Sequence, residues 1–169
     1  MTPRIRHDTG TPEWLVLHVR LTITAGYFGI FPETELIVWL RSVLGDSGKA
    51  LVVQPVEPYD RGEGAARHYT AVESIVDASV VAELVRLLDA IGFPGRPLHI
   101  DNTADPEMVR WERVTFEVSK DGKAASVQFT VGPGGMAGAD AVDLRQVLHV
   151  LWKSARIDSP WSDSLGLRQ

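Results

Sequence analysis

The sequence predicts an α+β fold, with helices covering one face of a sheet, and three observations support this prediction. An Asp-Gly pair separates two segments that alternate apolar and polar residues within 111–131. Residues 14–25 also alternate with a period of two, which is typical of a half-buried strand. Three other segments carry a single apolar stripe at helical spacing. A helix of that kind buries one side only, so we expect each to pack on a sheet.

Residues 111–131 are predicted to form a β-hairpin whose register follows from its turn. Asp121-Gly122 favours a two-residue type I′ turn, which places Lys120 opposite Lys123. The pairs on one face are then all apolar: Val118 with Ala125, Phe116 with Val127, and Val114 with Phe129. The pairs on the other face are all polar: Glu117 with Ser126, Thr115 with Gln128, and Arg113 with Thr130. A shift by one residue would mix the two faces, so one face is predicted to join the core.

The strand at 14–25 is predicted to lead into a helix. Pro32 is favoured in the first turn of a helix, and the carboxylates of Glu33 and Glu35 are favoured near its positive N-terminal end. Gly45 is favoured just after the C-terminal end of a helix. The apolar stripe of this helix would consist of Leu36, Leu40, Val43 and Leu44, with Trp39 beside them.

Two strands, 50–56 and 69–76, are predicted next, followed by a second helix. Asp77 or Ser79 would cap this helix and Gly92 would end it. Its stripe would consist of Val81, Leu84, Val85, Leu88 and Ile91.

The rest of the domain is predicted as a short strand at 97–101, an acidic loop at 102–108, the hairpin and a last helix. Asp140 would cap that helix, and its stripe would be Leu144, Val147, Leu148 and Leu151. The predicted order is βαββαβ, as in a ferredoxin-like fold, followed by a β-hairpin and a C-terminal helix.

The predicted domain organisation is simple. Residues 1–12 would form a loose N-terminal arm, 13–155 a single α+β domain, and 156–169 a mostly disordered C-terminal tail. The chain has 169 residues, of which 44% are hydrophobic, and this is enough for one well-buried core.

Composition excludes several function classes. The formal charge of −5 argues against nucleic-acid binding, which needs a basic surface. The chain has no cysteine, which excludes disulfides, thiolate nucleophiles and Cys-based zinc sites. We read no signal peptide and no membrane span, so we expect a cytoplasmic protein. Arg outnumbers Lys, and Ala, Gly and Val are abundant, which suggests a bacterial genome rich in GC. The oligomeric state stays open.

A glycine-rich segment, 132–138, lies between a predicted strand and a predicted helix, where phosphate-binding loops occur. Its spacing matches no nucleotide-binding motif, and Asp140 and Asp143 would place negative charge near a phosphate. We therefore predict a flexible connector and no cofactor.

His99 and Asp101 are expected on one face of a short strand, with further carboxylates, Asp105 and Glu107, in the adjoining loop. Such a group can ligate a divalent cation or exchange protons. This is the basis of the alternative function, a metal-assisted or acid–base hydrolase using His99 and the acidic loop 101–107. The same residues also fit a simpler interpretation, in which a strand ends and continues into a solvent-exposed acidic loop. We therefore predict no metal.

Tyr27, Phe28 and Phe31 lie close together in a segment flanked by glycine. Large aromatic side chains that stay exposed mark partner-binding sites, so these three residues are the predicted partner-binding residues. The competing interpretation is that the loop folds over the open end of the core. Trp161, Leu165 and Leu167 in the C-terminal tail are a second, weaker instance.

The second half of the chain carries one resemblance. A helix ending at Ile91-Gly92-Phe93, the strand pair 114–118 and 127–130, and a closing helix are similar to the elements of small bacterial emfourin-type protease inhibitors. The helix predicted at 32–44 has no counterpart there. The resemblance rests on element spacing and implies no site residue.

Together these patterns favour a small cytosolic protein that binds another protein. It would act as an inhibitor, an immunity-type protein or an accessory subunit, and not as an enzyme.

Overall fold

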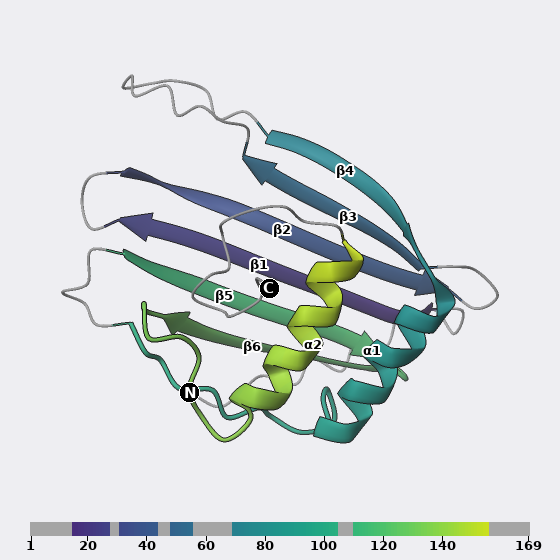
Figure 1. The fold of residues 1–169 in the computed structure, drawn as a ribbon. Helices are drawn as coiled ribbons and strands as arrows, with labels where there is room; N and C mark the ends of the chain where they lie inside the picture. Colours follow the sequence, from purple (N-terminus) through teal and green to yellow (C-terminus); the bar gives the residue numbers. More distant parts are fainter. Residues whose placement is uncertain (1–14, 28–30, 44–47, 56–68, 105–109, 156–169) are drawn as a thin grey trace.

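The computed structural model describes residues 15–27, 31–43, 48–55, 69–104 and 110–155, which form one antiparallel sheet and two helices (Figure 1). The elements in chain order are β1 Leu15–Tyr27, β2 Phe31–Val43, β3 Gly48–Pro55, β4 Tyr69–Val76, α1 Ala78–Ile91, β5 Arg110–Lys120, β6 Lys123–Val131 and α2 Ala141–Ser154. Across the sheet the order of the described strands is β4-β3-β2-β1-β5-β6, and every neighbouring pair is antiparallel.

Both helices lie on the same face of the sheet (Figure 1). The core between the two layers consists of alternate residues of the central strands and one stripe of each helix. From the sheet it takes Leu17, Val19, Leu21, Ile23, Val114, Phe116, Val118 and Phe129. From the helices it takes Val81, Leu84, Leu88, Ile91, Leu144, Val147, Leu148 and Leu151. The predicted α+β class and the stripes of the second and the last predicted helix are confirmed, with Val85 only partly buried beside this core.

The predicted hairpin is confirmed residue by residue. Lys120 pairs with Lys123, and all six pairs derived from the sequence occur in β5 and β6. Asp121 and Gly122 both have positive φ, 53° and 72°, as a type I′ turn requires. The hairpin joins the sheet through β5, which lies beside the central strand β1. On the face away from the helices, Arg20 of β1 lies opposite Glu117 of β5, with 3.7 Å between Nε and Oε2.

The helix predicted at 32–44 is wrong, because this segment is strand β2. Its residues pair with β1 on one side and β3 on the other, so the backbone hydrogen bonds of a helix are replaced by two ladders. The spacing of Leu36 and Leu40 fits a helix, but it equally fits alternate positions of a strand. Both lie opposite fully buried residues of β1, and Leu40 itself is fully buried. The described order is therefore ββββαββα and not the predicted βαββαβ followed by a β-hairpin and a helix.

Two smaller predictions also need correction. Within 97–101 only Asp101 makes a strand-like pair, an isolated bridge with Ala137, and the segment forms no regular strand. Asp77 and Asp140 do precede α1 and α2, but neither carboxylate caps its helix with a hydrogen bond. Gly92 ends α1 as predicted, in a left-handed conformation.

The predicted arm 1–12 and tail 156–169 lie outside the described residues. Neither α1 nor α2 is long and apolar enough to cross a membrane, and these are the helices of the described part.

Candidate functional site

One end of the sheet gathers aromatic residues from separate parts of the chain. At this end β1 and β3 finish, while β2, β4 and β5 begin (Figure 1, left). Tyr27 is the last residue of β1, Phe31 the first of β2, Tyr69 the first of β4 and Trp111 the second of β5. We call these four residues the aromatic strand ends.

The strand register brings three of the aromatic strand ends close together. Tyr27 pairs directly with Phe31 on one side and with Arg110 on the other. Trp111 is the next residue of β5 and pairs with Gly26. Tyr69 lies on β4, three strands away from β1, and pairs with Pro55, the last residue of β3. Aromatic positions therefore extend across this end of the sheet from β5 to β4.

Two of the three predicted partner-binding residues, Tyr27 and Phe31, are thus on neighbouring strands, and Phe28 lies outside the described residues. The predicted setting was wrong in one respect, because the aromatic segment joins two strands and not a strand to a helix. Sequence reasoning missed Tyr69 and Trp111. Their only signal was that each stands at the start of an alternating segment, and the strand order was needed to relate them to Tyr27.

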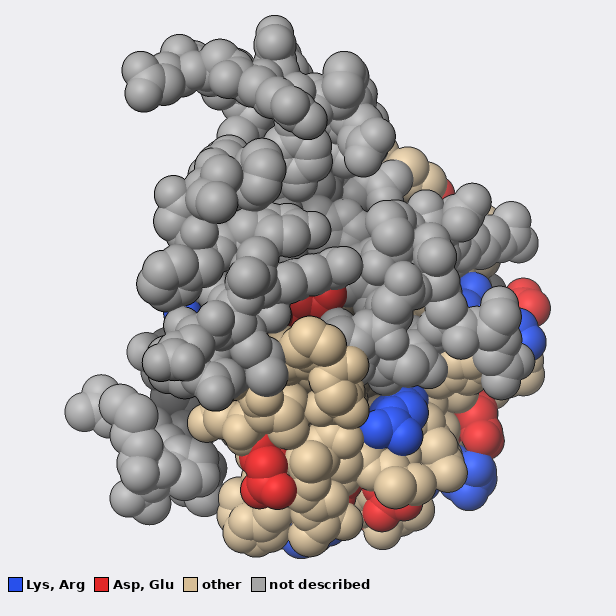
Figure 2. Space-filling view, turned by 60° about the vertical axis from the view of Figure 1, so that its left-hand side comes forward, with Lys and Arg blue, Asp and Glu red and all other residues tan. Residues whose placement is uncertain are grey.

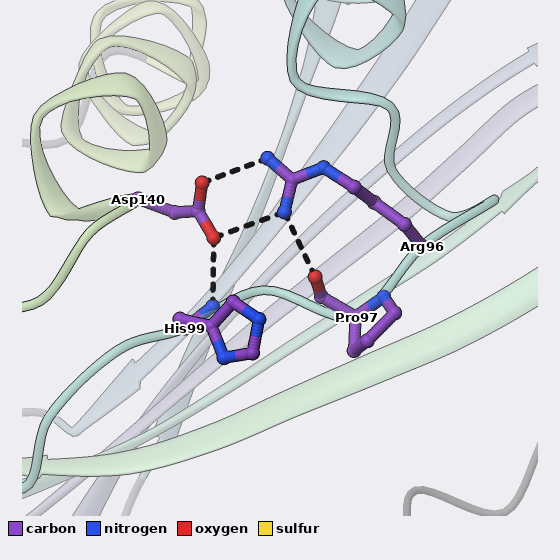
Figure 3. A network of polar contacts seen from close by, with 4 residues as sticks. All are labelled: Arg96, Pro97, His99 and Asp140. Carbon is purple, nitrogen blue, oxygen red and sulfur yellow. Dashed lines mark hydrogen bonds and ion pairs between the residues drawn. The ribbon is translucent and has the colours of Figure 1, made fainter.

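A buried carboxylate links the N-terminal end of α2 to the segment that follows α1 (Figure 3). The Asp140 side chain accepts hydrogen bonds from Arg96 Nη2 at 2.7 Å, from Arg96 Nη1 at 3.1 Å and from the His99 backbone N–H at 2.8 Å. The Asp140 backbone N–H in turn donates to the His99 carbonyl at 3.2 Å. Arg96 also donates to the Pro97 carbonyl at 3.0 Å. These contacts explain why the carboxylate does not cap α2.

The same contacts lower the pKa of Asp140 to about 2, mainly through the Arg96 hydrogen bonds and secondarily through the His99 N–H. A carboxyl with a lowered pKa contributes stability above the unfolded-state value of 3.8 and loses it as the pH falls toward 2. The carboxylate is therefore a structural anion at neutral pH, and its three hydrogen bonds leave it no role in proton exchange.

We predict that Asp140→Asn lowers the free energy of unfolding by about 1–2 kcal/mol at pH 7, after discounting for the partial exposure of Arg96. The loss should shrink as the pH falls from about 4 to about 2, because the wild-type carboxyl becomes protonated there. Urea unfolding across this pH range measures it. Arg96→Gln should remove most of the same pH dependence. If the free energy of unfolding of Asp140→Asn fell with pH as steeply as that of the wild type between about pH 4 and pH 2, the lowered pKa would not belong to Asp140.

His99 and Asp101, the residues of the alternative hydrolase, both have exposed side chains in the structure. Their backbones are used structurally: both backbone groups of His99 bond to Asp140, and the Asp101 N–H donates to the Ala137 carbonyl at 2.8 Å. Among the described residues, no group of three or more His, Asp or Glu side chains is placed to hold a metal ion. Asp105 and Glu107 lie outside the described residues.

The glycine-rich segment 132–138 is held against 99–103 and is not the flexible connector that the sequence suggested. The Thr103 hydroxyl donates to the Gly135 carbonyl at 2.8 Å and accepts from the Gly132 N–H at 3.1 Å. Gly138 has φ 120°, and a Cβ built there would lie 2.5 Å from the His99 carbonyl oxygen. The glycine at 138 is therefore needed for close backbone approach, which is a structural role.

A small open pocket of about 190 Å³ lies where the hairpin turn meets the end of α1. The Lys120 ammonium beside it is buried and contacts Asp121 and Asp89, the latter at 2.7 Å. Burial alone would lower the pKa of Lys120, but the two carboxylates outweigh it and the pKa is raised. Because its charge is already neutralised within the chain, Lys120 ties the hairpin to α1 and offers little to a ligand.

On the face shown in Figure 2, the basic and acidic side chains of the described residues are interspersed and form no continuous basic patch. Neither the models of known protein families nor the curated proteins give a match to this chain. The likeness to emfourin-type inhibitors accordingly stays a prediction from element spacing.

Proposed function

We propose that this chain acts by binding another protein through the end of the sheet that carries the aromatic strand ends. The observation that supports this proposal is that Tyr27, Phe31, Tyr69 and Trp111, from four strands, all lie at one end of the sheet. Tyr, Trp and Phe are enriched at the centres of protein interfaces, where a few large side chains supply most of the binding free energy.

The framework behind these positions favours the same function. A few residues inward from the aromatic strand ends, β1 and β5 carry fully buried residues, among them Ile23 and Val114, which pair with each other. Strands anchored in this way give the aromatic strand ends a fixed backbone framework, and binding residues commonly lie at positions carried by a rigid scaffold. An inhibitor, an immunity-type protein or an accessory subunit would use such a preformed surface without catalysis.

The experiment uses the double variant Tyr27→Ser with Phe28→Ser. We expect its melting temperature to stay close to that of the wild type, while affinity for a partner purified from the native host falls about thirtyfold or more. That loss corresponds to the roughly 2 kcal/mol or more that truncating an interface anchor costs. Titration calorimetry with the purified partner measures the affinity, and differential scanning calorimetry measures the melting temperature.

The matched control is Val142→Ser, since Val142 is an exposed apolar residue on α2 and not on a strand of the sheet. It should leave partner affinity unchanged. A large fall in the melting temperature of the double variant would instead show that the aromatic residues close the core, and would remove the basis of the proposal.

A further inference from the structure

The two edges of the sheet differ in how the chain covers them. At the β6 edge, the Thr103 backbone N–H donates to the Thr130 carbonyl at 2.9 Å, and Thr130 donates its own N–H to Asn102 at 2.9 Å. The other edge is β4, which pairs with β3 on one side, and no strand of the described residues pairs with its other side. An edge strand of this kind is a template for pairing with another chain.

Each face of β4 carries one large exposed apolar side chain, and Glu73 is the only charged residue of this strand. Val72 is 52% exposed and Ile75 is 71% exposed, and they are two of the three exposed large hydrophobic residues of the described part. Val72 shares the helix-covered face with the buried Val76, whereas Ile75 lies on the opposite face. The sequence of β4 contains no Lys or Pro, the residues that commonly protect an edge strand from pairing.

We infer that β4 pairs antiparallel with β4 of a second copy of this chain, about a two-fold axis at Val72. Directly opposed residues of antiparallel strands share a face, so a two-fold axis between identical strands must lie midway between one residue and its own copy, and not between two different residues. This leaves Val72, Glu73 and Ser74 as the central candidates in the strand.

The register centred on Val72 gives compatible pairs throughout. Val72 faces Val72 of the second copy, Glu73 faces Ala71, Ser74 faces Thr70, and Ile75 faces Tyr69. Centring on Glu73 would oppose two carboxylates, and centring on Ser74 would oppose Glu73 to Ile75, both of which are unfavourable cross-strand pairs. Pairing at Val72 would join two six-stranded sheets into one continuous sheet.

The first test compares the oligomeric state of the full chain and its variants by sedimentation velocity over a range of concentrations. We expect a dimer for the wild type. Val72→Lys should raise the dimer dissociation constant at least about tenfold, because it opposes two ammonium groups on the axis. Val142→Lys, at an exposed site on α2, should behave as the wild type. A monomeric wild type, or a dimer indifferent to Val72→Lys in a variant with unchanged circular dichroism, would overturn the inference.

The second test determines the register, and the absence of cysteine from the chain makes it specific. Val72→Cys should form a disulfide-linked dimer under mild oxidation, because facing residues of antiparallel strands have Cα atoms within disulfide reach. Ile75→Cys should not, since its equivalent in the second copy would lie about six residues along the strand, roughly 20 Å away. Efficient cross-linking of Ser74→Cys or Ile75→Cys in place of Val72→Cys would overturn the register. The register places Tyr69, one of the aromatic strand ends, opposite Ile75, but both tests read only the association of this chain with itself, so neither depends on the proposed function.

Discussion

Phe116→Ala should lower the free energy of unfolding by about 3–5 kcal/mol, the usual cost of deleting a fully buried aromatic ring. The Phe116 side chain is completely buried on the helix-facing side of β5, opposite Leu21 of the central strand. Its ring stacks on that of Phe93, with 6.0 Å between centroids and 23° between planes. The variant therefore loses apolar burial and one aromatic pair, and it leaves a cavity between the sheet and the segment following α1.

Thr115→Ala is the matched control, because Thr115 is the neighbouring residue on the opposite, half-exposed face of the same strand. It should cost less than about 1 kcal/mol. Urea unfolding monitored by circular dichroism gives both values under identical conditions. Equal losses would mean that the two faces of the hairpin do not differ in burial, contrary to the register.

The hairpin could be predicted in full because its information is local. The turn Asp121-Gly122 fixes which residues face each other, and the alternation of apolar and polar residues then has one solution. The stripes of α1 and α2 were predictable for the same reason, since 3.6-residue periodicity is contained within each segment. None of these predictions needed knowledge of the neighbouring elements.

The segment that forms β2 shows where local sequence information fails to predict the secondary structure. Leu36 and Leu40 are spaced four residues apart, which suits a helix, but Ile37, Val38 and Leu40 also suit a buried strand. The decision depends on β1 and β3, which supply partners for the β2 backbone on both sides. Tertiary pairing therefore overrides the helix-start signals of Pro32 and the two glutamates that follow.

The contacts of the candidate sites were beyond the sequence for a related reason. Arg96 and Asp140 are 44 residues apart, and each looks like an ordinary surface or capping residue in its own segment. Tyr69 and Trp111 likewise join Tyr27 only through the strand order. Local patterns identified the aromatic residues of one turn, and the sheet was required to show that this turn is part of a larger aromatic end.

The glycine-rich segment leads to the second large expected effect, at Gly138. Its φ of 120° lies in a region that other residues rarely adopt, and an added Cβ would meet three backbone atoms at 2.5–2.9 Å. These atoms belong to His99, Ile100 and Asp101. They cannot retreat freely, because the His99 carbonyl accepts from the Asp140 N–H and the Asp101 N–H donates to Ala137. Added bulk at this position must therefore separate 99–101 from 137–140.

Gly138→Ala should accordingly destabilise the fold by about 3 kcal/mol or more, the sum of backbone strain and overpacking against atoms that are themselves hydrogen-bonded. Gly134→Ala is the control within the same segment, because no atom lies within 4 Å of its built Cβ and its φ is not positive. That variant should be neutral or more stable by up to about 1 kcal/mol, through a less flexible unfolded chain. Thermal unfolding of the two variants side by side measures the contrast. A Gly138→Ala protein as stable as the wild type would show that the close contact between 99–101 and 137–140 does not exist. The hydrogen bonds of Asp140 to Arg96 and His99, which depend on that contact, would then also be wrong.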